Sequence, residues 1–176
     1  MQGLSVLELC AGGGGQSLGL EEAGFHLAAA IEIERNACET LQLNRPGWRV
    51  LCKDVREIEG REFRGVDLLA AGVPCPPFSI AGKQLGSQDE RDLFPEALRL
   101  AEQIKPSAII FENVRGFAGS KFDEYRQNLL SRLHDLGYEP QWRVLNACDF
   151  GVPQQRPRIV LVALLARFAS GFRWPL

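Results

Sequence analysis

The stretch LSVLELCAGGGGQSLGLEEAG, residues 4–24, decides the fold. Its apolar run 4–9 ends in glycines, which is typical of a buried parallel strand followed by a sharp turn. Residues 16–23 favour a helix, and Gly24 is a residue type that commonly ends one. The stretch therefore predicts a strand, a glycine loop and a helix in immediate succession.

The same alternation continues along the chain. Further strands are predicted at 26–33, 49–52, 66–71 and 107–114, and helices at 34–44, 90–104 and 121–136. Alternating strands and helices indicate βαβ units and a mostly parallel sheet. The last two predicted strands, 141–147 and 158–165, follow each other without a helix, so we expect an antiparallel hairpin at the sheet edge. The sequence therefore predicts one α/β domain over residues 1–165 and a less patterned tail at 166–176.

The composition is that of a soluble globular domain. Among 176 residues, 45% are hydrophobic and 24% charged, and the net charge of -2 gives no overall basic field for nucleic acid. Five cysteines without a CxxC pair argue against a disulfide framework or a zinc site and favour a reducing compartment. The N-terminus has no secretory pattern, and no apolar run approaches the ~18 residues of a membrane span. We therefore expect a cytoplasmic protein with no metal and no membrane association.

The glycine loop indicates a nucleoside pocket without a pyrophosphate cradle. Neither the spaced glycines of the dinucleotide fingerprint nor a Gly-Lys-Ser/Thr sequence is present. Glu32 lies 20 residues after Gly12, at the end of the second predicted strand, where a carboxylate can accept both ribose hydroxyls. Asp54, beyond the third strand, is similarly placed for an adenine amino group. The alternatives are a strand-end surface charge at Glu32 and a turn residue at Asp54.

The stretch GVPCPPFS, residues 72–79, places a cysteine between prolines just after a buried strand. Ligands of open α/β sheets gather at the carboxyl ends of the strands. Pro74 fixes its own φ, and Pro76 excludes the helical region for Cys75, so the thiol is presented in one direction. A buried cysteine can also be a small hydrophobe, but packing needs no prolines. Cys75 is therefore a candidate nucleophile.

Four motifs in order resemble the DNA cytosine-5 methyltransferase family of the bacterial modification type. They are the glycine loop, PCPPFS, ENV at 112–114 and QQRPR at 154–158, and the resemblance runs from residue 4 to about 165. It implies a Rossmann-like fold of the S-adenosylmethionine-dependent methyltransferases, S-adenosylmethionine as cofactor and double-stranded DNA as substrate. The implied reaction is methyl transfer to C5 of a flipped-out cytosine through a covalent adduct between Cys75 and C6.

The resemblance also implies a set of cofactor-binding residues. They are Cys10, Ala11, Gly12, Gly13, Gly14, Gly15, Glu32, Ile33, Asp54, Val55, Pro74 and Leu93. In the family Glu32 takes the ribose, Asp54 and Val55 meet the adenine, and Leu93 packs near the methionine. The chain departs from the family at Ile33, where many relatives place an aromatic residue beneath the adenine.

The catalytic residues implied are Cys75, Glu112, Arg156 and Arg158, and the substrate-binding residues are Ser79, Asn113 and Gln154. Glu112 is expected at N3 and the exocyclic amine of the cytosine, and Arg158 at its O2. Asn113 is expected to brace the backbone near Pro74, and Arg156 the catalytic loop or the DNA backbone. Alternation of Gln154, Arg156 and Arg158 predicts that they share one side of an incoming strand. The alternative for Glu112 is a structural glutamate at a strand end. The alternative for Gln154, Arg156 and Arg158 is a basic, solvent-exposed start of a strand.

Two further expectations concern a loop within the resemblance and the part of the family that is missing after it. Gly82 and Gly86 permit a loop that could close over the flipped base. Nothing after residue 165 resembles the target-recognition domain or the C-terminal segment of the family, so we expect a fragment or one subunit of a split enzyme, which folds but methylates poorly alone. The alternatives to a DNA methyltransferase are a transfer-RNA cytosine-5 methyltransferase and a non-catalytic partner subunit.

Overall fold

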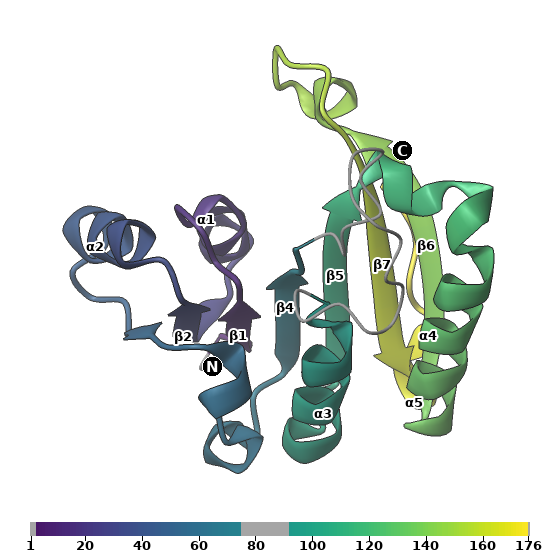
Figure 1. Cartoon of the computed structure of the whole chain (residues 1–176), viewed down its shortest axis with the longest axis horizontal. Coiled ribbons are helices and arrows are strands. Elements are labelled where there is room, and N and C mark those ends of the chain that lie inside the picture. Colours follow the sequence, from purple (N-terminus) through teal and green to yellow (C-terminus); the bar gives the residue numbers. More distant parts are fainter. Residues whose placement is uncertain (1–2, 75–91, 176) are drawn as a thin grey trace.

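The structure is a computed structural model and describes residues 3–74 and 92–175. Its centre is a seven-stranded sheet in the order β3-β2-β1-β4-β5-β7-β6. The first five strands of this order are parallel, whereas β7 runs antiparallel to both β5 and β6. Figure 1 shows the arrowheads of β1, β4 and β5 at one edge of the sheet and that of β7 at the other. The predicted α/β class and the antiparallel edge hairpin are confirmed.

The elements follow the predicted order. The strands are β1 Ser5–Leu9, β2 His26–Glu32, β3 Val50–Cys52, β4 Leu68–Gly72, β5 Ala108–Val114, β6 Tyr138–Asn146 and β7 Pro157–Leu165. The α-helices are α1 Gly15–Glu22, α2 Arg35–Asn44, α3 Phe94–Ile104, α4 Asp123–Asp135 and α5 Ala166–Ala169. Short 3-10 turns are η1 Val55–Glu57, η2 Gly60–Phe63, η4 Arg115–Ala118, η5 Ser120–Phe122 and η6 Ala147–Phe150.

Most boundaries lie within two residues of the predicted ones, and two starts differ by three or four residues. Helix α3 begins at Phe94 rather than 90, because the Asp92 carboxylate accepts the Phe94 N–H and Pro95 fits only the first turn. Strand β6 begins at Tyr138 rather than 141 and includes Pro140. Because β6 is the edge strand, the missing N–H of Pro140 disrupts no ladder bond on a central strand.

The predicted shared face of Gln154, Arg156 and Arg158 is wrong. Strand β7 begins at Pro157, so Gln154 and Arg156 lie in the preceding loop and do not alternate. Backbone bonds shape this loop: the Gln154 N–H donates to Val152, and the Arg156 carbonyl accepts from Ala147. Only Arg158 has the strand geometry that the alternation assumed.

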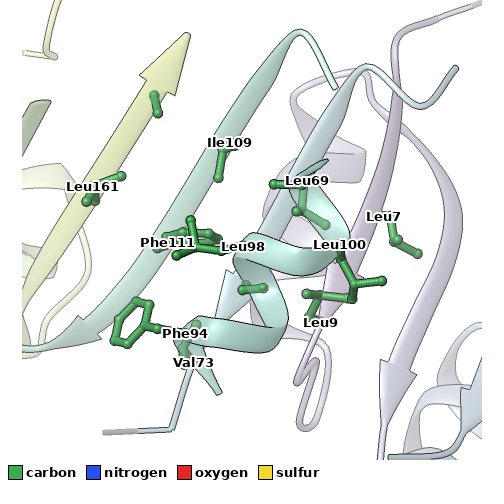
Figure 2. Packing of buried hydrophobic residues seen from close by; sticks show 14 of the residues in the cluster. Leu7, Leu9, Leu69, Val73, Phe94, Leu98, Leu100, Ile109, Phe111 and Leu161 are labelled. Carbon is green, nitrogen blue, oxygen red and sulfur yellow. The ribbon is translucent and has the colours of Figure 1, made fainter. Parts of the chain in front are cut away.

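The core lies mainly between the sheet and the helices α3 and α4. Leu7 and Leu9 of β1, fully buried, point to this face, and Figure 2 shows them beside Leu100 of α3. The opposite face carries a smaller cluster that includes Val6 and Leu41 of α2. Burying a leucine side chain stabilises the folded state by about 1.5–3 kcal/mol relative to leaving it exposed, so the larger cluster holds α3 and α4 on the sheet.

The end of the chain packs on the edge strand. The indole N–H of Trp174 donates to the Gln141 side chain at 3.0 Å, and the Ala166 N–H donates to the Gly137 carbonyl. Residues 166–175 therefore fold against β6 and β7 instead of leaving the sheet. In the described ranges, no helix has the length and apolar character needed to cross a membrane.

Candidate active site

The glycine loop after β1 turns through backbone conformations that most residues avoid. Cys10, Gly12 and Gly14 have φ values of 55°, 55° and 87°. A Cβ on Gly14 would lie 2.5 Å from Cδ2 of Leu41 in α2, so a side chain there would collide as well as strain the backbone. The loop therefore stays close to α2 and exposes backbone rather than side chains.

Glu32 connects this loop to the end of β2. One carboxylate oxygen, Oε2, accepts the Gly12 N–H at 2.6 Å, and the other, Oε1, accepts the Ile33 and Glu34 N–H groups at 2.8 Å. The residue is 7% exposed, so it is not the strand-end surface charge considered as the alternative. Because a carboxylate oxygen has two acceptor positions, Oε2 keeps one for a further donor.

A pocket of about 260 Å³ opens beside Glu32, at the carboxyl ends of β1, β2 and β4. It is lined by Cys10, Ile31, Glu32, Ile33, Lys53, Asp54, Val55, Arg56, Gly72, Pro74 and Leu93. Most of the predicted cofactor-binding residues outside the glycine loop therefore meet in one cavity. We call this cavity the cofactor pocket.

The far end of the cofactor pocket is built by Asp54 and its neighbours. The Asp54 carboxylate accepts the Arg56 N–H and pairs with the Arg56 guanidinium, both at 2.9 Å, and so begins the turn η1. Asp54 is thus a turn residue and a pocket residue at once. Ile33 is 60% exposed, which leaves an open apolar surface between Glu32 and Asp54.

A second pocket, of about 470 Å³, adjoins the first and shares Cys10 and Gly72 with it. Its wall is formed by Glu8, Cys10, Ala11, Gly13, Gly15, Gln16, Gly72, Glu112 and Arg156. Two predicted catalytic residues, Glu112 and Arg156, lie here together with four predicted cofactor residues of the glycine loop, namely Cys10, Ala11, Gly13 and Gly15. We call it the catalytic pocket.

Glu112 is fixed by its place in the sheet and by an arginine. It lies opposite Gly72 at the end of β5, and its Oε1 atom lies 2.9 Å from Nε of Arg158 on β7. Its neighbour Asn113 is buried and donates its side-chain amide to the Val73 carbonyl at 3.0 Å. The structure therefore brings Glu112 and Arg158 together and connects β5 to the chain just before Pro74.

Glu8 of β1 is a functional candidate that the sequence analysis missed. It is 1% exposed, accepts a hydrogen bond from the Ser17 hydroxyl and lines the catalytic pocket. Burial raises the pKa of its carboxyl to about 7, against the lowering effect of Ser17, and the charge of Glu32 raises it further. The available signal was a single acid inside the apolar run 4–9.

Some predicted residues are not brought into these pockets. Gln154 is exposed in the loop before β7 and is absent from both walls. Gly14 borders a separate groove with Leu18 and Trp48. Cys75, Ser79 and the loop glycines Gly82 and Gly86 lie outside the described residues.

The described cysteines also bear on the site. Cys10, Cys38, Cys52 and Cys148 are free thiols, and burial raises the pKa of Cys10 to about 12. A thiol with so high a pKa is almost entirely protonated at neutral pH and a poor nucleophile. Among residues 3–74 and 92–175, no group of three or more His, Cys, Asp or Glu side chains could hold a metal ion.

Comparisons with known proteins identify relatives along almost the whole chain. Relatives include the Type II methyltransferase M.NgoMIV of Neisseria gonorrhoeae, 57% identical over 96% of this chain and 54% of its own length. M.NaeI of Lentzea aerocolonigenes is 54% identical over 99% of this chain and 43% of its own length. The chain thus spans about half the length of these curated relatives.

Solved structures with the same fold include DNMT2 of Spodoptera frugiperda. That structure superposes with a TM-score of 0.77 and 26% identity, covering 98% of this chain and 52% of DNMT2. The sequence model of the C-5 cytosine-specific DNA methylases matches residues 4–172. This chain belongs to the C-5 cytosine-specific DNA methylase family.

Proposed function

We propose that the chain is the catalytic part of a DNA cytosine-5 methyltransferase that uses S-adenosylmethionine. The observation that carries the proposal is the shared wall of the two pockets, at Cys10 and Gly72. One pocket offers a buried carboxylate with a free acceptor position, and the other offers Glu112, which pairs with Arg158 behind the wall. A donor bound in the first can therefore reach a base bound in the second.

The cofactor pocket fits S-adenosylmethionine by shape and chemistry. Oε2 of Glu32 can accept a ribose hydroxyl, and the apolar side chains of Ile33, Val55 and Leu93 can contact the adenine and the methionine chain. No phosphate-binding loop is needed for a nucleoside with a single ribose. Added Cβ atoms on Gly13 and Gly15 would meet nothing within 4 Å, so the loop gives a ligand room against the backbone.

The residues of the catalytic pocket suit nucleophilic attack on cytosine. When bound, S-adenosylmethionine supplies an electrophilic methyl group on a sulfonium. The Cys75 thiolate would add to C6, which makes C5 electron-rich, and this splits one difficult step into easier ones. Glu112 would contact N3 and the exocyclic amine, where attack at C6 builds negative charge. Arg158, which pairs with Glu112, would contact O2. Once C5 carries the methyl group, loss of its proton to solvent water would re-form the C5–C6 double bond, break the bond from C6 to sulfur and release the Cys75 thiolate.

The two alternatives make different demands on the site. A non-catalytic partner subunit needs neither the Glu112–Arg158 pair nor a nucleophile, so the pair at the pocket favours an enzyme. The Type II relatives favour DNA over RNA as the substrate. Because the chain spans about half of those relatives, full activity is expected only together with the remaining half.

A covalent trap tests the proposal. The chain, alone and mixed with the C-terminal half of M.NgoMIV, is incubated with 5-fluorocytosine duplex DNA and S-adenosylmethionine, then run on a denaturing gel. We expect a covalent band that Cys75→Ser removes and that Cys148→Ser, at an exposed free thiol, retains. Unlabelled DNA should compete for the band more strongly than RNA. Absence of the band in both mixtures, or its persistence in Cys75→Ser, contradicts the proposal.

A further inference from the structure

A hydrogen bond between α4 and the start of α3 links elements far apart in the sequence. The Tyr125 hydroxyl donates to Oδ2 of Asp92 at 2.5 Å, across 33 residues. Asp92 is 8% exposed, and its other oxygen, Oδ1, accepts the Phe94 N–H at 3.0 Å. The Asp92 carboxylate is therefore bound from two directions, once by its own helix and once by α4.

The Tyr125 ring is positioned independently of this bond. Its centroid lies 6.0 Å from that of Phe94 and 5.9 Å from that of Phe117, in tilted and edge-on packing. Burial and the neighbouring Asp92 raise the pKa of Tyr125, so the hydroxyl stays a neutral donor throughout the working pH range. Removing the hydroxyl alone should leave the ring and its aromatic neighbours in place.

Asp92 is directly followed by a residue of the cofactor pocket. Leu93 lines that pocket, and Phe94, which follows, is 2% exposed in the core. Asp92 also follows segment 75–91, which contains Cys75. Before this segment, Val73 accepts the Asn113 side-chain amide. Side chains from β5 and α4 thus bind the residues on both sides of it.

We propose that Tyr125 is a positioning residue, which fixes Asp92 and thereby sets Leu93 against the cofactor pocket. The inference rests on the proposed use of that pocket for S-adenosylmethionine. Without the Tyr125 bond, the Asp92 carboxylate keeps the Phe94 N–H as its donor among the described residues, and Leu93 can move away from the ligand. The expected effect is therefore on ligand affinity, beyond any loss of stability.

The chain offers a matched control in its second tyrosine. Tyr138 is 2% exposed, and its hydroxyl donates to the Pro106 carbonyl at 2.7 Å, outside both pockets. Tyr125→Phe removes a half-buried hydroxyl with its bond to Asp92, and Tyr138→Phe removes a buried hydroxyl with its bond to Pro106. They should lower the unfolding temperature by similar amounts and differ only in ligand binding.

Calorimetric titration with S-adenosylhomocysteine, up to its solubility limit, is the test. We expect the affinity to fall about five- to tenfold in Tyr125→Phe and by less than about twofold in Tyr138→Phe, as for one lost buried hydrogen bond. In an Asp92→Ala background, Tyr125→Phe should cause no further loss, since the two residues act through one contact. Asp92→Asn, which can still bond to Tyr125, should lose less than Asp92→Ala.

The outcomes separate the positioning role from the proposed function. If the unaltered chain binds and both tyrosine variants bind equally well, the positioning role of Tyr125 is overturned and the cofactor pocket stands. If the unaltered chain does not bind S-adenosylhomocysteine at all, the proposed function fails and the positioning role fails with it.

Discussion

The two adjoining pockets fix their charged groups in different ways. In the cofactor pocket, the Glu32 carboxylate is bound by three backbone N–H groups, two of them from the next two residues of the chain. In the catalytic pocket, Glu112 pairs with the side chain of Arg158, and Glu8 bonds to the side chain of Ser17. The cofactor pocket is thus set largely by local backbone, and the catalytic pocket by side chains of other elements, β7 and α1.

Because of this difference, we expect substitutions in the two pockets to affect stability and activity differently. Backbone donors cannot leave Glu32 without breaking the loop or the end of β2, so changes there should affect folding and binding together. The Glu112–Arg158 pair is 32% and 25% exposed in its side chains, and pairs of that exposure contribute little to stability. Changes in the catalytic pocket should therefore impair the reaction while leaving the fold nearly intact.

The largest expected effect is on the reaction, in Glu112→Gln. The rate of methyl transfer should fall by roughly 10²–10⁴-fold, the range for losing a positioned acid–base group. The free energy of unfolding should change by less than about 1 kcal/mol, since the pair is partly exposed. Radiolabel transfer to duplex DNA and urea unfolding measure the two quantities. The control, Glu139→Gln at an exposed position of β6, should change neither the rate nor the free energy of unfolding. A large loss of stability in Glu112→Gln would contradict the distinction between the two pockets.

The next effect concerns pH and Glu8. Its folded pKa of about 7 lies above the ordinary value of 4.5, so the protonated form is favoured in the folded state. The resulting stability is fully present below pH ~4.5 and is lost as the pH rises through about 7, by at most about 3 kcal/mol. Glu8→Gln should remove this decline. Urea unfolding at pH 5 and pH 8 measures this decline in the free energy of unfolding, and Glu59→Gln, at an exposed site, is the control. If the decline persists in Glu8→Gln, another group causes it.

Glu32→Ala should affect binding and stability together. Three backbone N–H groups lose their acceptor, and the affinity for S-adenosylhomocysteine should fall by about 1–3 kcal/mol. Calorimetry and thermal unfolding measure the two effects. Glu34→Ala removes an exposed side chain and keeps the N–H that bonds to Glu32, so it should bind normally. Unchanged affinity in Glu32→Ala would mean that Glu32 is purely structural.

The smallest effect is expected in the glycine loop. Gly14→Ala places a side chain at φ 87° and against Leu41, which should lower the free energy of unfolding by about 1–2 kcal/mol. Gly13→Ala adds the same methyl group where nothing lies within 4 Å and should cost well under that. Chemical denaturation of both variants decides the matter, and equal losses would contradict the loop conformation described here.

Much of the fold could be predicted from the sequence because its signals are periodic and local. The apolar runs, the glycine loop and Gly137, which follows α4 with φ 90°, each act over a few residues. The starts of α3 and β6 were misplaced by three or four residues, because the start of α3 depends on the bond from the Phe94 N–H to Asp92 and that of β6 on pairing with β7. The β6 boundary is thus decided by pairing with another strand, which no local pattern shows.

The site was predictable to a similar extent. Glu32 ends β2 and Asp54 follows β3, so both could be placed by counting residues, whereas Gln154 was misplaced by an assumed strand. Glu8 was missed because one acid in an apolar strand carries no local signal of its partner Ser17. Tyr125 was missed because Asp92 lies 33 residues away. Contacts of this kind become visible only when the sheet brings the elements together.

The most direct test of the account is an NMR titration of the ¹⁵N-labelled chain with S-adenosylhomocysteine. The account predicts that the largest amide shifts fall on Gly12, Ile33 and Glu34, whose N–H groups bond to Glu32, and on Val55 across the pocket. The amide of Tyr138, outside both pockets, should stay unchanged. Shifts that leave Gly12, Ile33 and Glu34 unaffected and gather elsewhere would contradict the assignment of the cofactor pocket.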